Sequence, residues 1–334
     1  MMKRWNMAGR MALLIAGIAL LLTGCGGALD PEGSVAKDQL KLINLSFFIM
    51  LTVMVVVFGL FFYVIIRFRK RKGQTGYPKQ IEGSHKLEII WTAIPFLLIM
   101  VIAVTTVMMT FEQDKPADES TAIKVQVIGH QFWWEFYYPD YDIRTAQDLV
   151  LPTGSWVNAE LTSSDVIHSF WIPQLAGKLD ANPGLKRNLA FQTSDQVKVY
   201  LGKCAELCGD GHALMDFKTV VKSPEDFNAW VEKMKTPAPE LTTAAEIAGQ
   251  EIFSKTAQCL TCHAVTSDAP GKGPNLAGFA DRETVGGFRP NNDEWLAKWI
   301  HNPEGVKPGA TMPGFDFLTD QETDDLIAYL RTLK

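Results

Sequence analysis

The chain has 334 residues, of which 47% are hydrophobic and 21% are charged, and its formal net charge is −5. Residues 1–111 have twelve basic and five acidic residues (net +7), residues 112–239 have twelve and eighteen (net −6), and residues 240–334 have eight and fourteen (net −6). This division excludes a single domain in uniform surroundings and predicts three regions in different environments. No nucleic-acid partner is expected.

The first 24 residues have the pattern of a secretory signal peptide. Basic residues stand near the start, the apolar run MALLIAGIALLL follows, and small residues come next. This order is typical of a cleaved signal rather than of a spanning helix. The ending LTGC resembles a bacterial lipobox and predicts that Cys25 is the lipidated first residue of the mature chain. An ordinary signal with an incidental cysteine is the alternative.

Two apolar runs predict a transmembrane hairpin within residues 25–111. Residues 42–66 and 89–111 contain no charge, and each run exceeds the ~20 residues that cross a bilayer as a helix. The intervening loop RFRKRKGQTGYPKQIEGSHK is rich in Lys and Arg, so the positive-inside rule places it in the cytoplasm. We therefore expect two spans in lipid contact in a bacterial plasma membrane, with the soluble domains on the outer side.

Residues 112–235 predict a β-rich domain. Short runs rich in Val, Ile and aromatic residues, such as AIKVQVIGHQFWWEFYY and LAFQTSDQVKVYL, alternate with Pro, Gly, Asn and Asp. This alternation is typical of an antiparallel sandwich or barrel. A helix is expected at 224–235, and the prolines of KTPAPELTTAAE indicate a semi-extended linker over 236–243.

Residues 244–334 change to a helical pattern. Three helix starts are expected, capped by Thr243 with Glu246, by Asp293, and by Thr319 with Glu322.

A cluster of metal-ligating residue types closes the β-rich region. The stretch GKCAELCGDGHALMDF contains Cys204, Glu206, Cys208, His212 and Met215. A disulfide is one interpretation, because an oxidising compartment favours it. Zinc is a second, but thioether sulfur is an unusual zinc ligand, whereas thiolate, imidazole and thioether together suit copper.

This stretch resembles the binding loop of the dinuclear CuA centre in subunit II of haem-copper cytochrome c oxidases. The resemblance covers roughly residues 40–235 and implies a cupredoxin-like fold. It implies that Cys204 and Cys208 bridge two coppers, that His212 and His168 of SSDVIHSFWIPQ each bind one, that Met215 is a weak axial ligand, and that the backbone carbonyl of Glu206 completes the set.

The same resemblance implies further roles. The Glu206 carboxylate would help to bind magnesium at the contact with the catalytic subunit I, and Asp165 would belong to that polar interface. Glu88 matches an acid at the mouth of a proton pathway, although a glutamate at the membrane surface is equally expected there. In many relatives a tryptophan that accepts electrons from soluble cytochrome c stands where this chain has Phe132. Trp133 and Trp134 are then the other candidates, unless these rings simply pack on the domain core.

The motif Cys259-x-x-Cys262-His263 is the pattern of covalent c-type haem attachment, although chance or a redox disulfide is compatible with so short a pattern. The later stretches KGPNLAGF and GATMPGFDFLT resemble class I cytochromes c, a small all-α fold. The resemblance implies Met312 as the second axial ligand and Pro274 as the carbonyl that supports His263. Thioether opposite imidazole raises the haem potential, which suits an electron carrier.

Together the parts resemble the caa-type oxidases of bacteria. The resemblance implies that an external donor, such as a soluble or membrane-bound cytochrome c, reduces haem c, which reduces the copper pair. That pair then reduces a catalytic partner subunit, which converts oxygen to water with proton translocation. The alternatives are a donor subunit of a CuA-containing nitric oxide reductase and a free-standing membrane-anchored carrier. A quinol oxidase is disfavoured, because quinol-fed relatives do not need the copper ligands. His85, His130 and His301 are not expected to bind metal.

Overall fold

The computed structural model describes residues 9, 17, 27–77, 82–237 and 239–334. It divides into two compact units, one of Lys37–Lys115 and one of Met1–Ala36 with Pro116–Lys334. Cys25 and nearly all of the predicted signal peptide lie outside the described residues.

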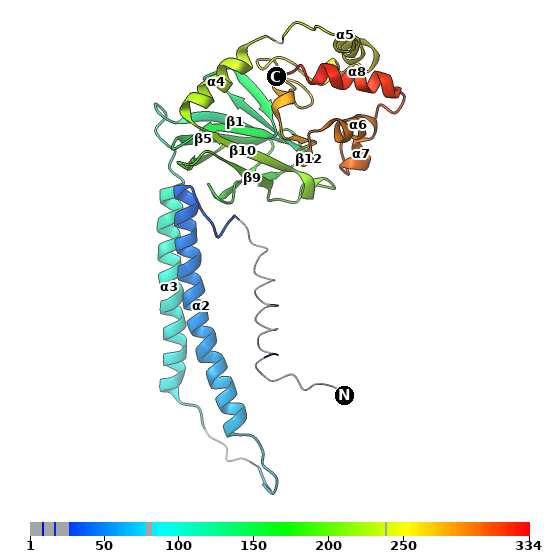
Figure 1. Ribbon diagram of the computed structural model, residues 1–334. Helices are drawn as coiled ribbons and strands as arrows, with labels where there is room; N and C mark the ends of the chain where they lie inside the picture. The colour runs from blue at the N-terminus through cyan, green and yellow to red at the C-terminus, as the bar shows by residue number, and fades with distance from the viewer. Residues whose placement is uncertain (1–8, 10–16, 18–26, 78–81, 238) are drawn as a thin grey trace. The chain divides into compact units, whose positions relative to one another are not determined.

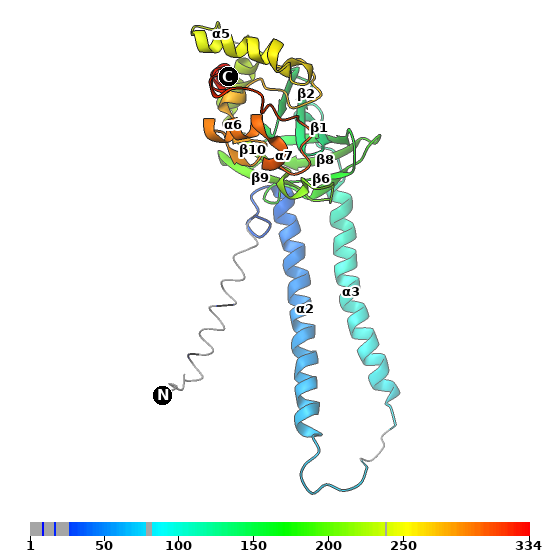
Figure 2. The same ribbon diagram turned by 90° about the vertical axis from the view of Figure 1, so that its right-hand side faces the viewer.

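The smaller unit is a pair of apolar helices, α2 (Ser34–Arg67) and α3 (His85–Gln113). Both are long and apolar enough to cross a membrane, and in each the most apolar stretch is unburied. They run in opposite directions (Figures 1 and 2), with Gln39 Nε2 3.3 Å from Gln113 Oε1 near one end. A helix that is apolar on all sides and unburied matches a lipid environment. These helices contain both predicted spans, so this part of the chain is a membrane anchor.

The larger unit begins with a β-sandwich of ten strands. They are β1 (Ile123–His130), β2 (Trp133–Tyr138), β3 (Ile143–Ala146), β4 (Asp148–Pro152), β5 (Trp156–Ser163), β6 (His168–Trp171), β7 (Lys178–Ala181), β8 (Arg187–Gln192), β9 (Lys198–Cys204) and β10 (Asp216–Lys222). One sheet has the order β3-β2-β1-β5-β8 and the other β4-β10-β9-β6-β7. Figure 1 labels β1 and β5 of the first sheet and β9 and β10 of the second. The predicted cupredoxin-like sandwich is confirmed.

The sheets are not wholly antiparallel. β1 pairs with β5 in parallel, and so does β4 with β10, whereas the other pairings are antiparallel. The reason is topological: after β3 the chain moves to the second sheet as β4 and then returns to the first as β5. A strand that returns after such a crossover can run parallel to its neighbour. The alternation of short strands and turns in the sequence carries no information about this crossing.

Aromatic rings fill the space between the sheets. Trp134, Phe136, Phe170 and Phe217 are fully buried, and the rings of Phe170 and Phe217 stack with centroids 4.7 Å apart. Burial of such large apolar side chains contributes most of the favourable free energy of a core. Gly202 lies directly under Phe217, where a Cβ would be 2.1 Å from the ring. Glycine at this point of β9 therefore lets the stack form next to the strand that ends at Cys204.

The segment before α2 packs on the sandwich. Glu32 accepts hydrogen bonds from Tyr200 (2.7 Å), Ser194 (3.1 Å) and Lys198. The bonds from Lys198 and Tyr200 lower the pKa of this carboxyl. Gly33 lies so close to the sandwich that a Cβ would be 2.3 Å from the Leu175 carbonyl oxygen. The segment is thus fixed by both charge and close backbone contact.

After the sandwich come α4 (Pro224–Lys235) and a second helical region. Its elements are α5 (Ala244–Glu251), η3 (Ile252–Thr256), η4 (Cys259–Thr261), η5 (Phe279–Asp281), β11 (Thr284–Val285), β12 (Arg289–Pro290), α6 (Asp293–His301), α7 (Pro303–Val306) and α8 (Asp320–Leu330). Capping boxes form at Thr243 and at Thr319 as predicted. The cap of α6 was predicted one residue late. Asn292 is the N-cap, its side chain accepting from Trp295 N, and Asp293 is the first helical residue.

The first and last helices of this region, α5 and α8, cross at very close range. A Cβ on Gly249 of α5 would lie 1.9 Å from the Asp325 carbonyl oxygen of α8. Any larger residue would force the two backbones apart, so glycine is needed here despite its cost of roughly 1 kcal/mol relative to alanine in a helix.

Candidate metal centres

The predicted copper ligands stand in one turn, the ligand loop (residues 204–215), between β9 and β10. The two strands pair antiparallel, and Cys204 N donates to Met215 O at 3.1 Å, so the pairing extends to the base of the loop. A short 3₁₀ turn, η2 (His212–Leu214), brings the chain back. This hairpin folds five potential donor residues onto one end of the sandwich.

Within the loop the donor atoms converge. The Sγ atoms of Cys204 and Cys208 are 3.9 Å apart, so they form no disulfide. Cys208 Sγ also lies 3.7 Å from His212 Nδ1 and 3.8 Å from Met215 Sδ. Cys204 Sγ lies 3.3 Å from the Glu206 carbonyl oxygen. The Glu206 side chain itself is exposed.

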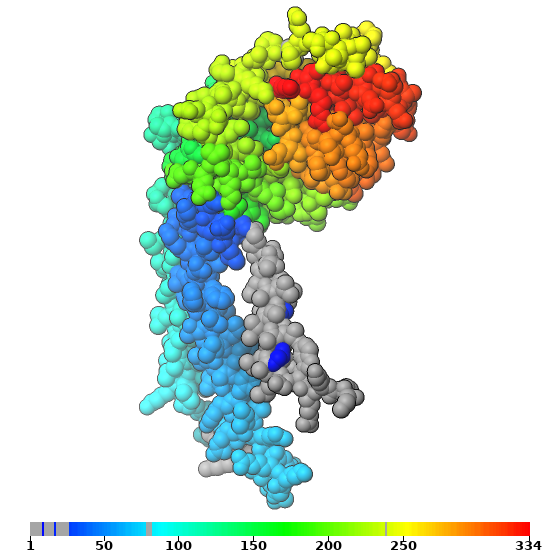
Figure 3. Space-filling model, in the orientation of Figure 1, coloured from blue at the N-terminus to red at the C-terminus, as the bar shows by residue number. Residues whose placement is uncertain are grey.

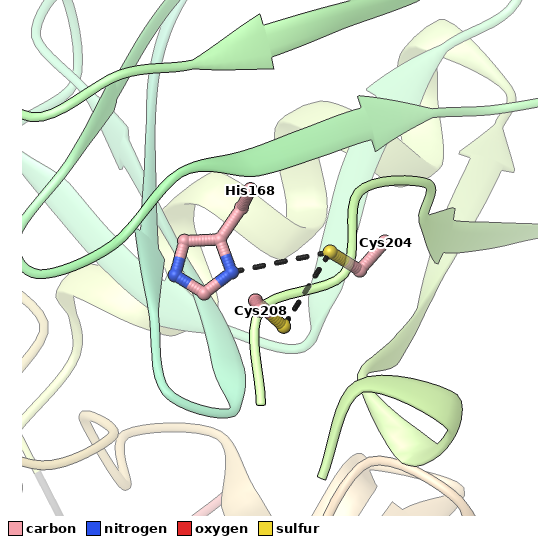
Figure 4. A group of neighbouring side chains, drawn as sticks. All are labelled: His168, Cys204 and Cys208. Carbon is pink, nitrogen blue, oxygen red and sulfur yellow. Dashed lines mark hydrogen bonds between the residues drawn. The ribbon is translucent and has the colours of Figure 1, made fainter. Parts of the chain in front are cut away.

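The second histidine comes from another strand. His168 opens β6, which pairs with β9, and its Nδ1 lies 3.9 Å from Cys204 Sγ (Figure 4). The ring is fully buried, and a Cβ on Gly129 would lie 2.7 Å from it. Burial lowers the pKa of His168, a shift that Asp165 opposes. The neutral ring that results is the form that binds a metal.

Asp165 holds His168 in this orientation. Its Oδ1 lies 2.8 Å from His168 Nε2 and accepts from Val166 N at 2.7 Å, while Oδ2 accepts from Gln131 N at 2.7 Å. Burial raises the pKa of Asp165, but the hydrogen bonds from His168 and the two amides outweigh it and lower the pKa. The carboxylate therefore fixes the proton on Nε2, which leaves the lone pair of Nδ1 facing Cys204.

The histidine of the haem-attachment motif is also held in place by a hydrogen bond. Cys259 begins η4, Cys262 follows its last residue as the C-cap, and neither forms a disulfide. His263 Nδ1 donates to the Pro274 carbonyl at 2.7 Å, as predicted, which leaves Nε2 free of a proton. Gly273 packs under this ring, where a Cβ would be 2.9 Å from Cε1. Met312 lies half-buried in the loop between α7 and α8.

Three family models match successive parts of the chain. Residues 29–109 match the family model "Cytochrome C oxidase subunit II, transmembrane domain", residues 142–223 match "Cytochrome C oxidase subunit II, periplasmic domain", and residues 247–334 match "Cytochrome c". Cytochrome c oxidase subunit 2 of Alkalihalophilus pseudofirmus is 40% identical over 100% of this chain and 99% of that protein. The chain belongs to the cytochrome c oxidase subunit 2 family.

Two further relatives are similar over different shares of the chain. Subunit 2 of Bacillus sp. strain PS3 is 47% identical and covers 97% of both chains. A "Quinol oxidase subunit 2" of Bacillus cereus is 34% identical over 72% of this chain and 84% of its own length. The chain is therefore an electron-transfer subunit of a terminal oxidase with a cytochrome c domain, and the nitric oxide reductase and free-carrier alternatives are not favoured. It is a subunit of cytochrome c oxidase, an oxidoreductase, which implies association with subunit I and the other oxidase subunits.

Family membership implies copper and haem c, and the donor set fits copper. Bonds of roughly 2.0–2.3 Å from sulfur or nitrogen place two ligands of a tetrahedral ion roughly 3.3–3.8 Å apart. The sulfur and nitrogen distances in the ligand loop are close to that range, and His168, Cys204 and Cys208 form a buried group able to hold a metal ion. Burial and the neighbouring Cys204 raise the pKa of Cys208 to about 12, so metal binding must displace its proton.

The three candidate electron-transfer aromatics occupy different environments. Trp134 is fully buried, and its ring centroid lies 5.8 Å from that of His168. This ring therefore packs in the domain core, as the alternative interpretation expected. Trp133 is half-buried and stacks on His130 at 4.0 Å. Phe132 is 7% exposed and lies over the ligand loop, where a Cβ on Gly211 would be 2.4 Å from its ring.

The histidines that were not expected to bind metal have other partners. His130 Nε2 lies 3.1 Å from Glu135 Oε2, and that carboxylate also pairs with Arg144 at 2.8 Å. His301 Nε2 forms a hydrogen bond with Thr323 Oγ1 at 3.0 Å. His85 pairs with Glu88, which is exposed at the start of α3, at 3.3 Å. None of the three belongs to the metal-binding group found among the described residues.

Gln131 contacts both the ligand loop and Asp165, a role that the sequence analysis did not predict. Its side-chain Nε2 donates to the Cys208 carbonyl at 2.6 Å, and its backbone amide binds Asp165. From the turn between β1 and β2, the side chain thus supports the ligand loop and the backbone amide supports the carboxylate that orients His168. A glutamine between two strands has no distinctive pattern, so no sequence signal indicates this role.

We expect Asp165→Ala to lower copper affinity by about 10–100-fold, the effect of losing an outer-shell carboxylate. The substitution frees His168 to rotate and leaves the amides of Gln131 and Val166 unpaired. Competition titration with a copper chelator measures the change, with Asp195→Ala, an exposed acid on the same domain, as the matched control. Equal affinities in the two variants would show that Asp165 does not orient His168.

Proposed function

We propose that this chain carries electrons from an external donor, through its cytochrome c domain and its copper domain, to a partner subunit in which oxygen is reduced to water with proton translocation. A soluble or membrane-bound cytochrome c is the proposed donor. The observation that supports the proposal most is the presence of two separately supported sites on one chain. One is the converging set around Cys204 and Cys208, and the other is the motif in which His263 is held by Pro274.

The copper site is assigned to the converging donors. A copper pair held by two thiolates would supply one-electron transfer with little change in its bond lengths, because the electron would be shared by both metals. We assign the bridging role to Cys204 and Cys208, terminal binding to His168 and His212, and weak binding to Met215 Sδ and the Glu206 carbonyl oxygen. Soft sulfur with imidazole nitrogen suits copper. The buried sandwich would hold these donors in one arrangement for both oxidation states of the bound metal.

The haem site is assigned to the second motif. Cys259 and Cys262 would form the thioether links, and His263 and Met312 the axial bonds. The hydrogen bond to Pro274 would keep His263 Nε2 directed at the iron and free of a proton. A histidine and methionine pair raises the potential of a c-type haem. The domain division that we propose is 1–24, 25–111, 112–235, 236–243 and 244–334, which the end of α4 at Lys235 and the start of α5 at Ala244 support.

The remaining predicted roles are proposals that rest on the family resemblance. They are magnesium binding by the Glu206 carboxylate at the contact with subunit I, a proton-pathway role for Glu88, and lipidation of Cys25. Glu206 is exposed, as a contact with a partner requires, but it is not in the metal-binding group found among the described residues. Glu88 stands in the first turn of α3, at the end of an expected span.

The proposal is tested on the full-length chain purified with its partners from the membrane. We expect a delocalised mixed-valence copper signal in paramagnetic resonance, a low-spin haem c spectrum, and recovery of a subunit that reduces oxygen. Mass spectrometry of the partners and a metal assay complete the measurement. Zinc in place of copper, or a partner that reduces nitric oxide, would overturn the assignment.

A further inference from the structure

A turn of the cytochrome c domain lies directly on the copper domain. This docking turn (Lys307–Gly309) precedes Met312 in the loop between α7 and α8. Lys307 Nζ donates to the Phe132 carbonyl at 2.6 Å and to the Gly286 carbonyl at 2.9 Å. One ammonium group thus joins the turn between β1 and β2 of the sandwich to the cytochrome c domain.

The docking turn and the ligand loop enclose the ring of Phe132. A Cβ on Gly309 would lie 2.6 Å from Phe132 Cε2, and a Cβ on Gly211 would lie 2.4 Å from Cδ2 and 2.9 Å from the Pro308 carbonyl oxygen. Gly309 has a φ of +78°, so a side chain there would be strained as well as crowded. The ring is therefore packed between the segment that leads to Met312 and the loop that carries Cys208 and His212. In space-filling view the two domains adjoin without a visible gap (Figure 3).

Lys307 is unusual for a lysine in a surface loop. It is 3% exposed, and no carboxylate of the described residues lies within ion-pair distance of its Nζ. The nearby Asp216 pairs with Lys203 at 3.0 Å instead. Burial lowers the pKa of Lys307 to about 8, the expected cost of removing an ammonium from water. Two carbonyl oxygens offset part of that cost, so the buried lysine is compatible with this fold only while both domains supply their acceptors.

We propose that Lys307 is a positioning residue for electron transfer: it fixes the docking turn on Phe132, so that the haem-binding loop and the copper-binding loop stay in contact during transfer. The inference rests on the proposed function. The step moves one electron from ferrous haem to the oxidised copper pair, and no proton moves and no covalent bond changes. Because the docking turn packs over Phe132, which is only 7% exposed, a separate donor protein cannot contact this ring directly.

Other contacts keep the two domains together when Lys307 is replaced. Arg144 N donates to the Ser267 carbonyl at 2.7 Å, Ser267 Oγ donates to the Met234 carbonyl at 2.7 Å, and Lys218 pairs with Glu283. A Lys307 variant therefore tests the placement of the docking turn rather than the attachment of the domain.

The test uses the assembled oxidase with Lys307→Met, which keeps the length of the side chain and removes its three donors. Lys298→Met is the matched control, because Lys298 is an exposed lysine of the same domain paired with Glu294. After flash reduction of haem c, transfer to copper is followed by the absorbance of both centres. We expect Lys307→Met to slow this step on the order of tenfold or more, as misplaced partners do, and reduction of haem c by a small-molecule donor to stay unchanged.

Two measurements report on the contact without electron transfer. Hydrogen exchange at residues 131–133 and 209–211 should be faster in Lys307→Met than in Lys298→Met. In the unmodified protein, an acylating reagent should label Lys307 several-fold more slowly than Lys298. Faster hydrogen exchange with an unchanged electron-transfer rate would show that Lys307 is only structural, and would overturn the proposal. Acylation of Lys307 as fast as that of Lys298 would also overturn it. Absence of copper or haem from the unmodified protein would instead refute the proposed function.

Discussion

Replacement of Cys204 by serine is expected to abolish the mixed-valence copper signal and to leave the haem c spectrum intact. Cys204 Sγ lies 3.9 Å from both Cys208 Sγ and His168 Nδ1 and 3.3 Å from the Glu206 carbonyl oxygen, so it contacts more donors than a terminal ligand would. A serine hydroxyl is a hard donor that binds copper poorly. Oxygen consumption should fall by more than the ~100-fold that loss of an outer-shell partner causes.

Paramagnetic resonance and copper analysis of the purified oxidase measure the effect. Ala205→Ser is the matched control, because it adds the same hydroxyl to the neighbouring position and removes no proposed ligand. The copper signal of this control should survive. Persistence of the delocalised signal in Cys204→Ser would show that the centre is not bridged by this cysteine.

Replacement of Met312 by histidine is expected to lower the reduction potential of haem c by on the order of 100 mV or more, within the ~0.8 V range that axial ligands set. The loss of a thioether ligand removes the stabilisation of the ferrous state. Because ~59 mV corresponds to a factor of ten for one electron, reduction by the donor becomes roughly fifty-fold less favourable. Copper content should not change, since Met312 is not part of the ligand loop.

Potentiometric titration of the full-length protein measures this shift, and the absorption band of the iron–thioether bond should disappear. Thr311→Ala, next to Met312 and without a proposed ligand role, should keep both the potential and the band. An unaltered potential in Met312→His would assign the sixth position to another side chain.

Local sequence signals predicted the helices well. α4 begins at Pro224 and ends at Lys235, as expected. The start is fixed locally, because the Ser223 side chain accepts from Asp226 N and Pro224 occupies the first turn. The start of α6 was misplaced by one residue, since Asn292 and Asp293 are both good caps and only the backbone angles separate them. The parallel pairings of β1 with β5 and β4 with β10 were missed, because pairing direction depends on the path of the whole chain.

The candidate sites show the same contrast between local patterns, which the sequence reveals, and long-range contacts, which it does not. The spacing from Cys204 to Met215 indicated the ligand loop, because all of these residues lie in one turn. His168 was named only through a family resemblance, since its approach to Cys204 depends on the pairing of β6 with β9. Lys307 was missed altogether. A single lysine in a loop has no pattern, and its importance arises only from the Phe132 carbonyl, which lies far away in the sequence.

The crossing of α5 and α8 at Gly249 joins the two ends of the cytochrome c domain in sequence. The domain therefore cannot close until α8 has been synthesised and exported, so the cysteines of its haem motif pass through the membrane on an open chain. Haem attachment, which needs access to Cys259 and Cys262, can occur in that interval. A chain cut short before Asp320 would lack the closing helix and should be degraded as an incompletely folded polypeptide even though every proposed haem ligand is present.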